Sequence, residues 1–160
     1  MNIVVSIARQ TLTLFDEGGR EVRCYFVSTA SRGAGELCGS YCTPRGKHLI
    51  RARIGDGQPE NAVFVGRRPS GEIYSPGLGA AFPERDWILT RILWLSGCEP
   101  ERNRLGCVDT MRRYVYIHGC PDTATMGVPG SHGCIRMRNA EIIDLFDRVP
   151  VYTPVNITED

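Results

Sequence analysis

Two short segments in the last third of the chain combine histidine with cysteine. His118 begins His118-Gly-Cys120, and Cys134 ends Ser131-His-Gly-Cys134. A thiol attacks a carbonyl as the thiolate, and a neighbouring imidazole takes up the thiol proton and later returns it to the leaving amine. A strand that ends at His118, followed by the turn-rich segment 121–130, can bring Cys134 beside His118. These residues therefore indicate acyl transfer by a nucleophilic cysteine.

The residues around Cys134 fit the same chemistry. Gly133 removes side-chain bulk where a substrate carbonyl must approach. The consecutive amides of residues 132 to 134 can turn toward a developing oxyanion, which acyl transfer requires. Simpler interpretations stay open: a buried thiol for Cys134, a structural role for His132 and a surface ion pair for Arg136.

A zinc site is the main alternative from another class of function. The two His-Gly-Cys tripeptides, together with Cys38-x-x-x-Cys42 and His48, supply zinc-ligand types. On a strand, His118 and Cys120 would share a face. Structural zinc sites usually use Cys-x-x-Cys pairs, however, and Pro121 indicates a turn, so catalysis is favoured and no metal is assigned. A non-catalytic scaffold is a further alternative.

The elements that must position these residues are mostly strands. β-Branched and alternating patterns predict strands at 3–7, 11–15, 22–29, 47–54, 62–65, 87–95, 113–118 and 151–157. Pro154 indicates an edge position for the last strand. Segments 31–46, 69–83 and 96–110 are expected to be irregular.

One helix is clearly indicated near residues 139–149. Asn139 can cap it, the apolar residues Ile142, Leu145, Phe146 and Val149 follow helical spacing, and a proline ends it. The expected fold is mainly β, with this helix near its C-terminal end.

Composition excludes several function classes. The chain has 160 residues, predicting a single domain over 1–160, and its formal net charge of +1 argues against a nucleic-acid binder. No apolar run is long enough to span a membrane, and no nucleotide-binding motif is present, so no cofactor is implied. The short apolar stretch after Met1 lacks a preceding basic region, so a cytoplasmic location is expected, or a periplasmic one if an export segment was removed.

The seven cysteines are many for a domain of this size, and their odd number leaves at least one unpaired within a monomer. In a reducing compartment all would be thiols, whereas an oxidising one would allow three bridges. The count alone leaves both possibilities open.

Two motifs carry a family resemblance. Tyr116-Ile-His-Gly119 followed by Ser131-His-Gly-Cys-Ile-Arg136 resembles the signature of the L,D-transpeptidase catalytic domain, also called the YkuD family. Val27-Ser-Thr29, Thr43-Pro-Arg-Gly46 and residues 149–157 are similar to the family's early strand, its Thr-Pro-x-Gly turn and its final strand. The loop between the two motifs is at the short end for the family. The implied fold is a β-sandwich of mixed sheets with a helix packed on it.

The resemblance implies that Cys134 is the nucleophile and His118 the general base. The backbone carbonyl of Gly119 would orient the base, so no acidic residue would be needed as a third catalytic member.

The resemblance also assigns the surroundings of the nucleophile. The amides of His132, Gly133 and Cys134 would form the oxyanion hole. Arg136 would hold a substrate carboxylate, and Ser131 and His132 would support the pocket.

The implied reaction opens the L,D bond before the terminal D-Ala of a peptidoglycan tetrapeptide stem through a Cys134 thioester. Water as acceptor would give L,D-carboxypeptidase activity on soluble muropeptides in murein recycling. An amine acceptor would give 3→3 crosslinks or D-amino acid exchange. The expected cytoplasmic location slightly favours water. The resemblance further implies acylation of Cys134 by carbapenems.

Overall fold

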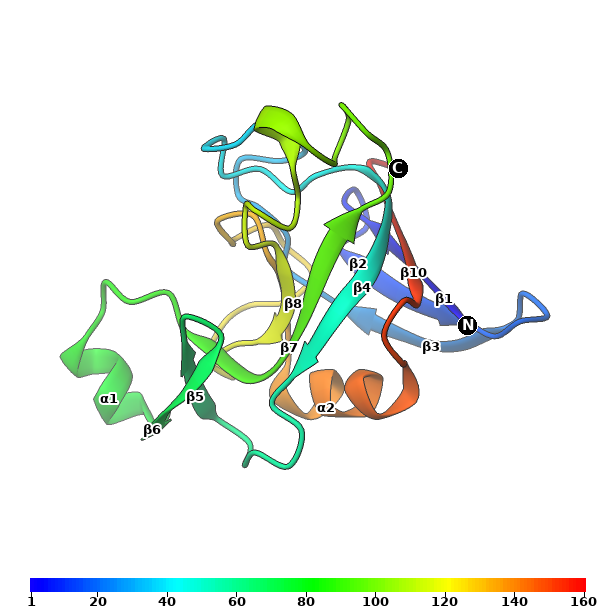
Figure 1. The fold of residues 1–160 in the computed structure, drawn as a ribbon. Helices are drawn as coiled ribbons and strands as arrows, with labels where there is room; N and C mark the ends of the chain where they lie inside the picture. Colours follow the sequence, from blue (N-terminus) through cyan, green and yellow to red (C-terminus); the bar gives the residue numbers. More distant parts are fainter.

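Strands dominate the computed structural model, which describes all 160 residues (Figure 1). Its elements are β1 (Asn2–Ser6), β2 (Thr11–Phe15), β3 (Glu21–Phe26), β4 (Gly46–Ile54), β5 (Ala62–Val65), β6 (Arg68–Ile73), α1 (Pro76–Ala81), β7 (Ile88–Gly97), a 3₁₀ turn at Gly106–Val108, β8 (Tyr116–Gly119), β9 (Ile135–Met137), α2 (Asn139–Arg148) and β10 (Pro154–Thr158). Neither helix is long and apolar enough to cross a membrane.

The strands form one curled, mixed sheet. Its order is β3-β2-β1-β10-β4-β7-β5-β6, and β8 joins β7 and carries β9. The β1–β10 and β8–β9 pairs are parallel, and the other pairs are antiparallel. The prediction of a mainly β fold with mixed strand pairing is confirmed, with the strands joined in a single continuous sheet.

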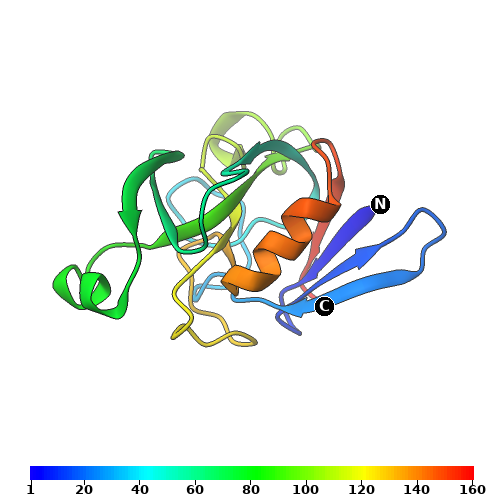
Figure 2. The same cartoon turned by 90° about the horizontal axis from the view of Figure 1, so that it is seen from below.

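Helix α2 covers one face of this sheet (Figure 2). Ile142, Leu145 and Phe146 are fully buried against apolar residues of the central strands, including Leu93 of β7 and Ile117 of β8. Burying a side chain of this size contributes about 1.5–3 kcal/mol. The predicted helical spacing is thus confirmed, and α2 fixes β7 and β8 from behind.

Asn139 does not cap α2, contrary to the sequence prediction. The N-cap position is Arg138, which makes no side-chain capping bond, and the helix begins at Asn139. The Asn139 side chain is fully buried and bonds to groups outside the helix. Hydrogen bonds to distant parts of the chain therefore outweigh the local preference of asparagine for the N-cap position.

Three further expectations about elements were wrong. Strand β10 lies between β1 and β4 instead of at an edge, and Pro154 fits because it is the first residue of the strand. Residues 69–83 contain β6 and α1, which Ser75 caps through the Leu78 amide. The strand predicted from Arg113 starts only at Tyr116, because residues 110–114 form turns with Tyr114 at φ +56°.

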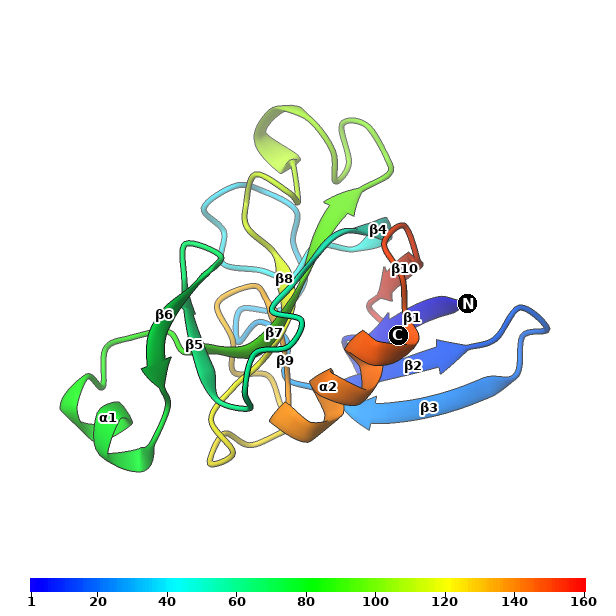
Figure 3. The ribbon, with the colours of Figure 1, turned by 60° about the horizontal axis from the view of Figure 1, so that its bottom comes forward.

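An arm made of β5, β6 and α1 projects from the side of the sheet, drawn in green in Figures 1 and 3. It returns through residues 82–87 into β7. Trp87 anchors this return, since its ring meets Tyr74 edge-on at 5.1 Å and the Arg85 guanidinium lies 4.2 Å from its centroid. This packing brings Asp86, which lies between Arg85 and Trp87 in the sequence, toward β9.

Candidate active site

Strands β8 and β9 bring the two histidine–cysteine segments together. They pair in parallel, with Ile117 opposite Ile135 and His118 opposite Arg136 (Figure 3). Side chains alternate along a strand, so Ile117 and Ile135 enter the core under α2 while His118 and Arg136 point to the opposite face. Cys134, just before β9, packs on that opposite face near Tyr116.

His118 is held as a neutral imidazole with one free lone pair. Its Nδ1 lies 2.6 Å from the carbonyl oxygen of Gly119, and because a carbonyl can only accept, Nδ1 carries the hydrogen. Its Nε2 is buried and has no hydrogen-bond partner. Burial lowers the pKa of His118, because the charged imidazolium would lose its hydration. An unpaired, neutral Nε2 is the form that a general base requires.

The thiol of Cys134 is not hydrogen-bonded to His118. Its Sγ accepts from the Tyr116 amide at 3.3 Å and donates to the Tyr114 carbonyl at 3.4 Å. Desolvation raises the pKa of the Cys134 thiol to about 12, with a smaller contribution from the negative charge of Asp86. The resting pair is therefore a neutral thiol and a neutral imidazole, and proton transfer requires the thiol to leave the Tyr114 carbonyl.

The turn before Cys134 is built around Gly133. Its φ of +127° lies in the region that favours glycine, and an added Cβ would lie 3.3 Å from the Cys42 carbonyl oxygen. Thr43 fixes the turn from outside by donating its hydroxyl to the Gly133 carbonyl at 2.9 Å. Ser131 fixes it from inside, donating to the Cys134 carbonyl at 2.5 Å and accepting from the Gly133 amide at 3.2 Å.

This arrangement leaves two of the three expected oxyanion-hole amides unpaired. The amides of His132 and Cys134 donate no hydrogen bond within the chain, whereas that of Gly133 is engaged by Ser131. Two convergent N–H groups are sufficient for an oxyanion hole. Stabilisation of an oxyanion by these groups stays a prediction.

Arg136 already holds a carboxylate of the protein. Its guanidinium donates to Asp86 Oδ1 at 3.1 Å and to the Gly130 carbonyl at 3.1 Å, and Asp86 Oδ2 lies 3.9 Å from Nδ1 of His132. An open pocket of about 420 Å³ borders this group, and residues 83–87, in the segment that connects the arm to β7, form one wall. A substrate carboxylate at Arg136 would have to share it with Asp86 or displace Asp86.

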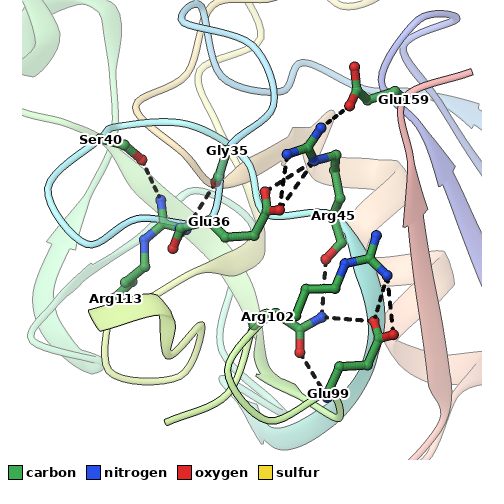
Figure 4. Close-up of polar contacts among 9 residues, drawn as sticks. Gly35, Glu36, Ser40, Arg45, Glu99, Arg102, Arg113 and Glu159 are labelled. Atoms are coloured by element: carbon green, nitrogen blue, oxygen red, sulfur yellow. Dashed lines mark hydrogen bonds and ion pairs between the residues drawn. The ribbon is translucent and has the colours of Figure 1, made fainter. Parts of the chain in front are cut away.

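The loop of residues 31–45 closes the site on the other side. The Arg113 guanidinium holds this loop in place. It donates to the carbonyls of Gly35 and Glu36, to the Ser40 hydroxyl and, at 2.6 Å, to the Cys42 carbonyl. Figure 4 shows the Arg113 contacts with Gly35, Glu36 and Ser40 beside the pairing of Arg45 with Glu36 and Glu159. The loop places Thr43 and Cys42 against the Gly133 turn. Arg113 therefore fixes the distance between the loop and this turn.

Sequence reasoning missed Asp86, Arg113, the role of Thr43 and the real role of Asn139. None of these residues belongs to a chemical motif, and Asp86 lies 50 positions before Arg136 in the chain. The one available signal is the Thr43-Pro-Arg-Gly46 turn, whose resemblance to the family's turn does not by itself specify a role for Thr43.

The zinc alternative finds no support in the geometry. No group of three or more His, Cys, Asp or Glu side chains comes together anywhere in residues 1–160. His48 is buried, and both of its ring nitrogens are hydrogen-bonded, Nδ1 to the Gly46 carbonyl and Nε2 to the Thr110 hydroxyl. Cys120 is buried and its thiol lies 3.3 Å from the Met137 carbonyl. All seven cysteines are free thiols in the structure.

Solved structures with the same fold include several L,D-transpeptidases. The L,D-transpeptidase (residues 123–326) from Xylanimonas cellulosilytica superimposes with a TM-score of 0.61 at 19% identity, over 98% of this chain and 59% of that one. L,D-transpeptidase 3 from Mycobacterium tuberculosis, in complex with a faropenem-derived adduct, gives 0.59 at 17% identity, over 98% and 59%. At these identities the match concerns the fold.

Sequence comparisons lead to the same group. A segment of 44 residues is 48% identical to the putative L,D-transpeptidase YqjB of Bacillus subtilis, covering 28% of this chain and 25% of that protein. The matched part of the chain thus spans 25% of the Bacillus subtilis protein and 59% of the Xylanimonas cellulosilytica chain, less than two thirds of either. The sequence profile described as YkuD, L,D-transpeptidase catalytic domain, matches residues 1–157. The chain therefore belongs to the L,D-transpeptidase catalytic domain (YkuD) family.

Proposed function

We propose that this domain is a cysteine acyltransferase that opens the L,D bond before the terminal D-Ala of peptidoglycan tetrapeptide stems. The observation that carries the proposal is the unpaired Nε2 of His118. His118 lies on β8, and Cys134 directly precedes the neighbouring strand β9. A buried nitrogen without a partner is costly, which supports a role in accepting a proton.

In the first half of the reaction, the thiol of Cys134 turns from the Tyr114 carbonyl toward Nε2 of His118. The sulfur attacks the substrate carbonyl while Nε2 takes the thiol proton, and the carbonyl oxygen becomes an oxyanion that the amides of His132 and Cys134 can receive. The C–N bond then breaks, a thioester forms, and His118 gives the proton to the amine of the leaving D-Ala. The Nδ1 bond to Gly119 stabilises the imidazolium that exists between these steps.

In the second half, we propose water as the acceptor. His118 takes a proton from water, the oxygen attacks the thioester, and the C–S bond breaks to give a tripeptide and the Cys134 thiolate, which recovers its proton from His118. The second candidate is an amine acceptor, which the names of the matched relatives favour, since they are called transpeptidases. The cytoplasmic location stays a prediction that fractionation of the native protein tests.

The direct test is incubation of the purified protein with a tetrapeptide muropeptide, with and without an excess of a D-amino acid. Tripeptide in both samples means hydrolysis, and an exchanged tetrapeptide in the second means transfer. Cys134→Ala should abolish both products. Cys120→Ala, the same change in the other His-Gly-Cys tripeptide, should retain them, and retained turnover in Cys134→Ala would overturn the proposal.

We also propose that β-lactams of the carbapenem type acylate Cys134, because ring opening by a thiol resembles the first half-reaction. The faropenem-derived adduct of the Mycobacterium tuberculosis protein supports this idea, because faropenem is a penem, a β-lactam class close to the carbapenems. The expected result is a covalent mass increase on the tryptic peptide that contains Cys134 and no increase on that peptide in Cys134→Ala.

A further inference from the structure

Asn139 lies directly behind the peptide that orients His118. Its side-chain NH₂ donates to the carbonyl of Cys120 at 2.9 Å and also reaches Oδ1 of Asn61 at 3.0 Å and Oδ1 of Asp122 at 3.2 Å. Its own Oδ1 accepts from the Thr90 hydroxyl at 2.6 Å. The side chain is fully buried and uses both its donor and its acceptor groups.

Thr90 holds Asn139 from a strained position. It has φ +74°, a conformation that is unfavourable for a β-branched residue, and it lies where the pairing between β7 and β8 shifts register between Leu89 and Ile92. In this bulge its hydroxyl donates to Asn139 and accepts from the Asn61 amide at 3.0 Å. Strain of this kind persists only where surrounding contacts impose it, and it concentrates near functional sites.

Gly119 is confined between these groups. A Cβ at this position would lie 2.5 Å from Asn139 Oδ1, 2.7 Å from the Leu89 carbonyl oxygen and 3.1 Å from Cβ of Thr90. The glycine is required by this close approach and not by its backbone angles, since its φ is not in the left-handed region. Asn139 thus packs on Gly119 and bonds the carbonyl of Cys120, which belongs to the following Cys120–Pro121 peptide, so the chain is held on both sides of the Gly119–Cys120 peptide.

We infer that Asn139 and Thr90 are positioning residues for the proposed base: they fix the Gly119–Cys120 peptide and thereby aim the Gly119 carbonyl at Nδ1 of His118. This inference rests on the proposed function for its catalytic meaning. The carbonyl fixes the tautomer of the ring, so the two residues act on Nε2 without touching the substrate. A base must be held within a fraction of an ångström of its working position, which a single strand-end carbonyl does not ensure by itself.

The first test needs no substrate. The chain contains three histidines, so ¹H–¹⁵N NMR can resolve each imidazole. In the wild type, His118 should show a slowly exchanging proton on Nδ1. Asn139→Ala and Thr90→Val should weaken this signal and admit the other tautomer. Thr90→Ser, which keeps the hydroxyl, should preserve it.

Asn103→Ala is the matched control. Asn103 is also a fully buried asparagine, whose NH₂ bonds the carbonyls of Arg45 and Lys47, away from β8. Its loss should lower the melting temperature and leave the His118 Nδ1 signal unchanged. If Asn139→Ala does not fold, the Thr90→Val and Thr90→Ser pair decides, since valine has nearly the shape of threonine.

The second test is turnover of the tetrapeptide muropeptide. Asn139→Ala and Thr90→Val should lower kcat by about tenfold to a hundredfold with little change in KM, and should alter the pH profile, while Thr90→Ser stays near the wild type. A wild-type Nδ1 signal together with a wild-type kcat in both variants would overturn the inference. Failure of the proposed function would be seen separately, as turnover that survives Cys134→Ala. In that case the NMR measurement would still test whether Asn139 and Thr90 position the His118 ring.

Discussion

The resting state of Cys134 predicts that this thiol reacts slowly with simple alkylating reagents. Its sulfur is engaged by the Tyr116 amide and the Tyr114 carbonyl, and its pKa is raised to about 12. Many catalytic cysteines are instead preformed thiolates that alkylate quickly at neutral pH. The perturbation is treatment of the folded protein with iodoacetamide at a series of pH values.

The expected rate follows from the thiolate fraction. At pH 7.5 a thiol of pKa 12 is ionised roughly 3,000-fold less than a free cysteine of pKa about 8.5. A more basic thiolate is intrinsically more nucleophilic, by about 40-fold over this interval. Cys134 should therefore alkylate about a hundredfold more slowly than a short cysteine peptide, with a rate that rises close to tenfold for each pH unit up to about pH 10.

The assay is quantitative peptide mass spectrometry of the seven cysteines over time. The exposed Cys24, Cys38, Cys98 and Cys107 should label before Cys134. His118→Ala should change the alkylation rate of Cys134 little, because Sγ is not bonded to the ring in the resting state. Rapid labelling of Cys134 at pH 6–7, lost in His118→Ala, would show a thiolate–imidazolium pair in place of the neutral resting thiol.

Three further predictions concern His118, Gly119 and His48. His118→Ala should lower kcat for the muropeptide on the order of a hundredfold or more, with the fold retained by circular dichroism; a near-normal rate would place the base elsewhere. Gly119→Ala should destabilise the folded protein by about 1–3 kcal/mol, because the added Cβ would meet Asn139 and the Leu89 carbonyl. The variant should also lose most of its activity, and an unchanged melting temperature would contradict the close approach of these groups to Gly119. Burial lowers the pKa of His48 to about 4, below its unfolded value of about 6.5, so protonation favours the unfolded chain and stability should fall between pH 6.5 and 4, by about 3 kcal/mol in total. Melting temperatures over this range should fall less steeply in His48→Gln, and parallel curves would exclude His48 as the cause.

The elements nearest the proposed nucleophile could be predicted because their signals are local. Alternation identified the strand that ends in His118, helical spacing identified α2, and the motif placed Cys134 one turn-rich loop later. Strand order could not be predicted, since β10 pairs with β1 from the other end of the chain. Pairing of that kind depends on packing of the whole sheet, which no local pattern encodes.

The surroundings of the site escaped prediction for a related reason. Asp86 reaches Arg136 only because the arm folds back through Trp87, and the sequence around Asp86 resembles any polar loop. The local preference of asparagine predicts that Asn139 caps the helix, whereas its side chain bonds to Thr90 and Cys120, which are distant in the sequence. The sequence pattern predicts a strand at Arg113, although the turn there is what lets the guanidinium reach the 31–45 loop.

The central claim is that Cys134 forms the acyl-enzyme and that His118 moves its proton. The most direct measurement is rapid-quench mass spectrometry of the protein mixed with a tetrapeptide muropeptide, followed by mapping of the modified peptide. We expect an acyl group equal to the substrate less D-Ala on Cys134, formed much more slowly in His118→Ala. Release of D-Ala at the wild-type rate by Cys134→Ala, or an acyl group on another cysteine, would contradict it.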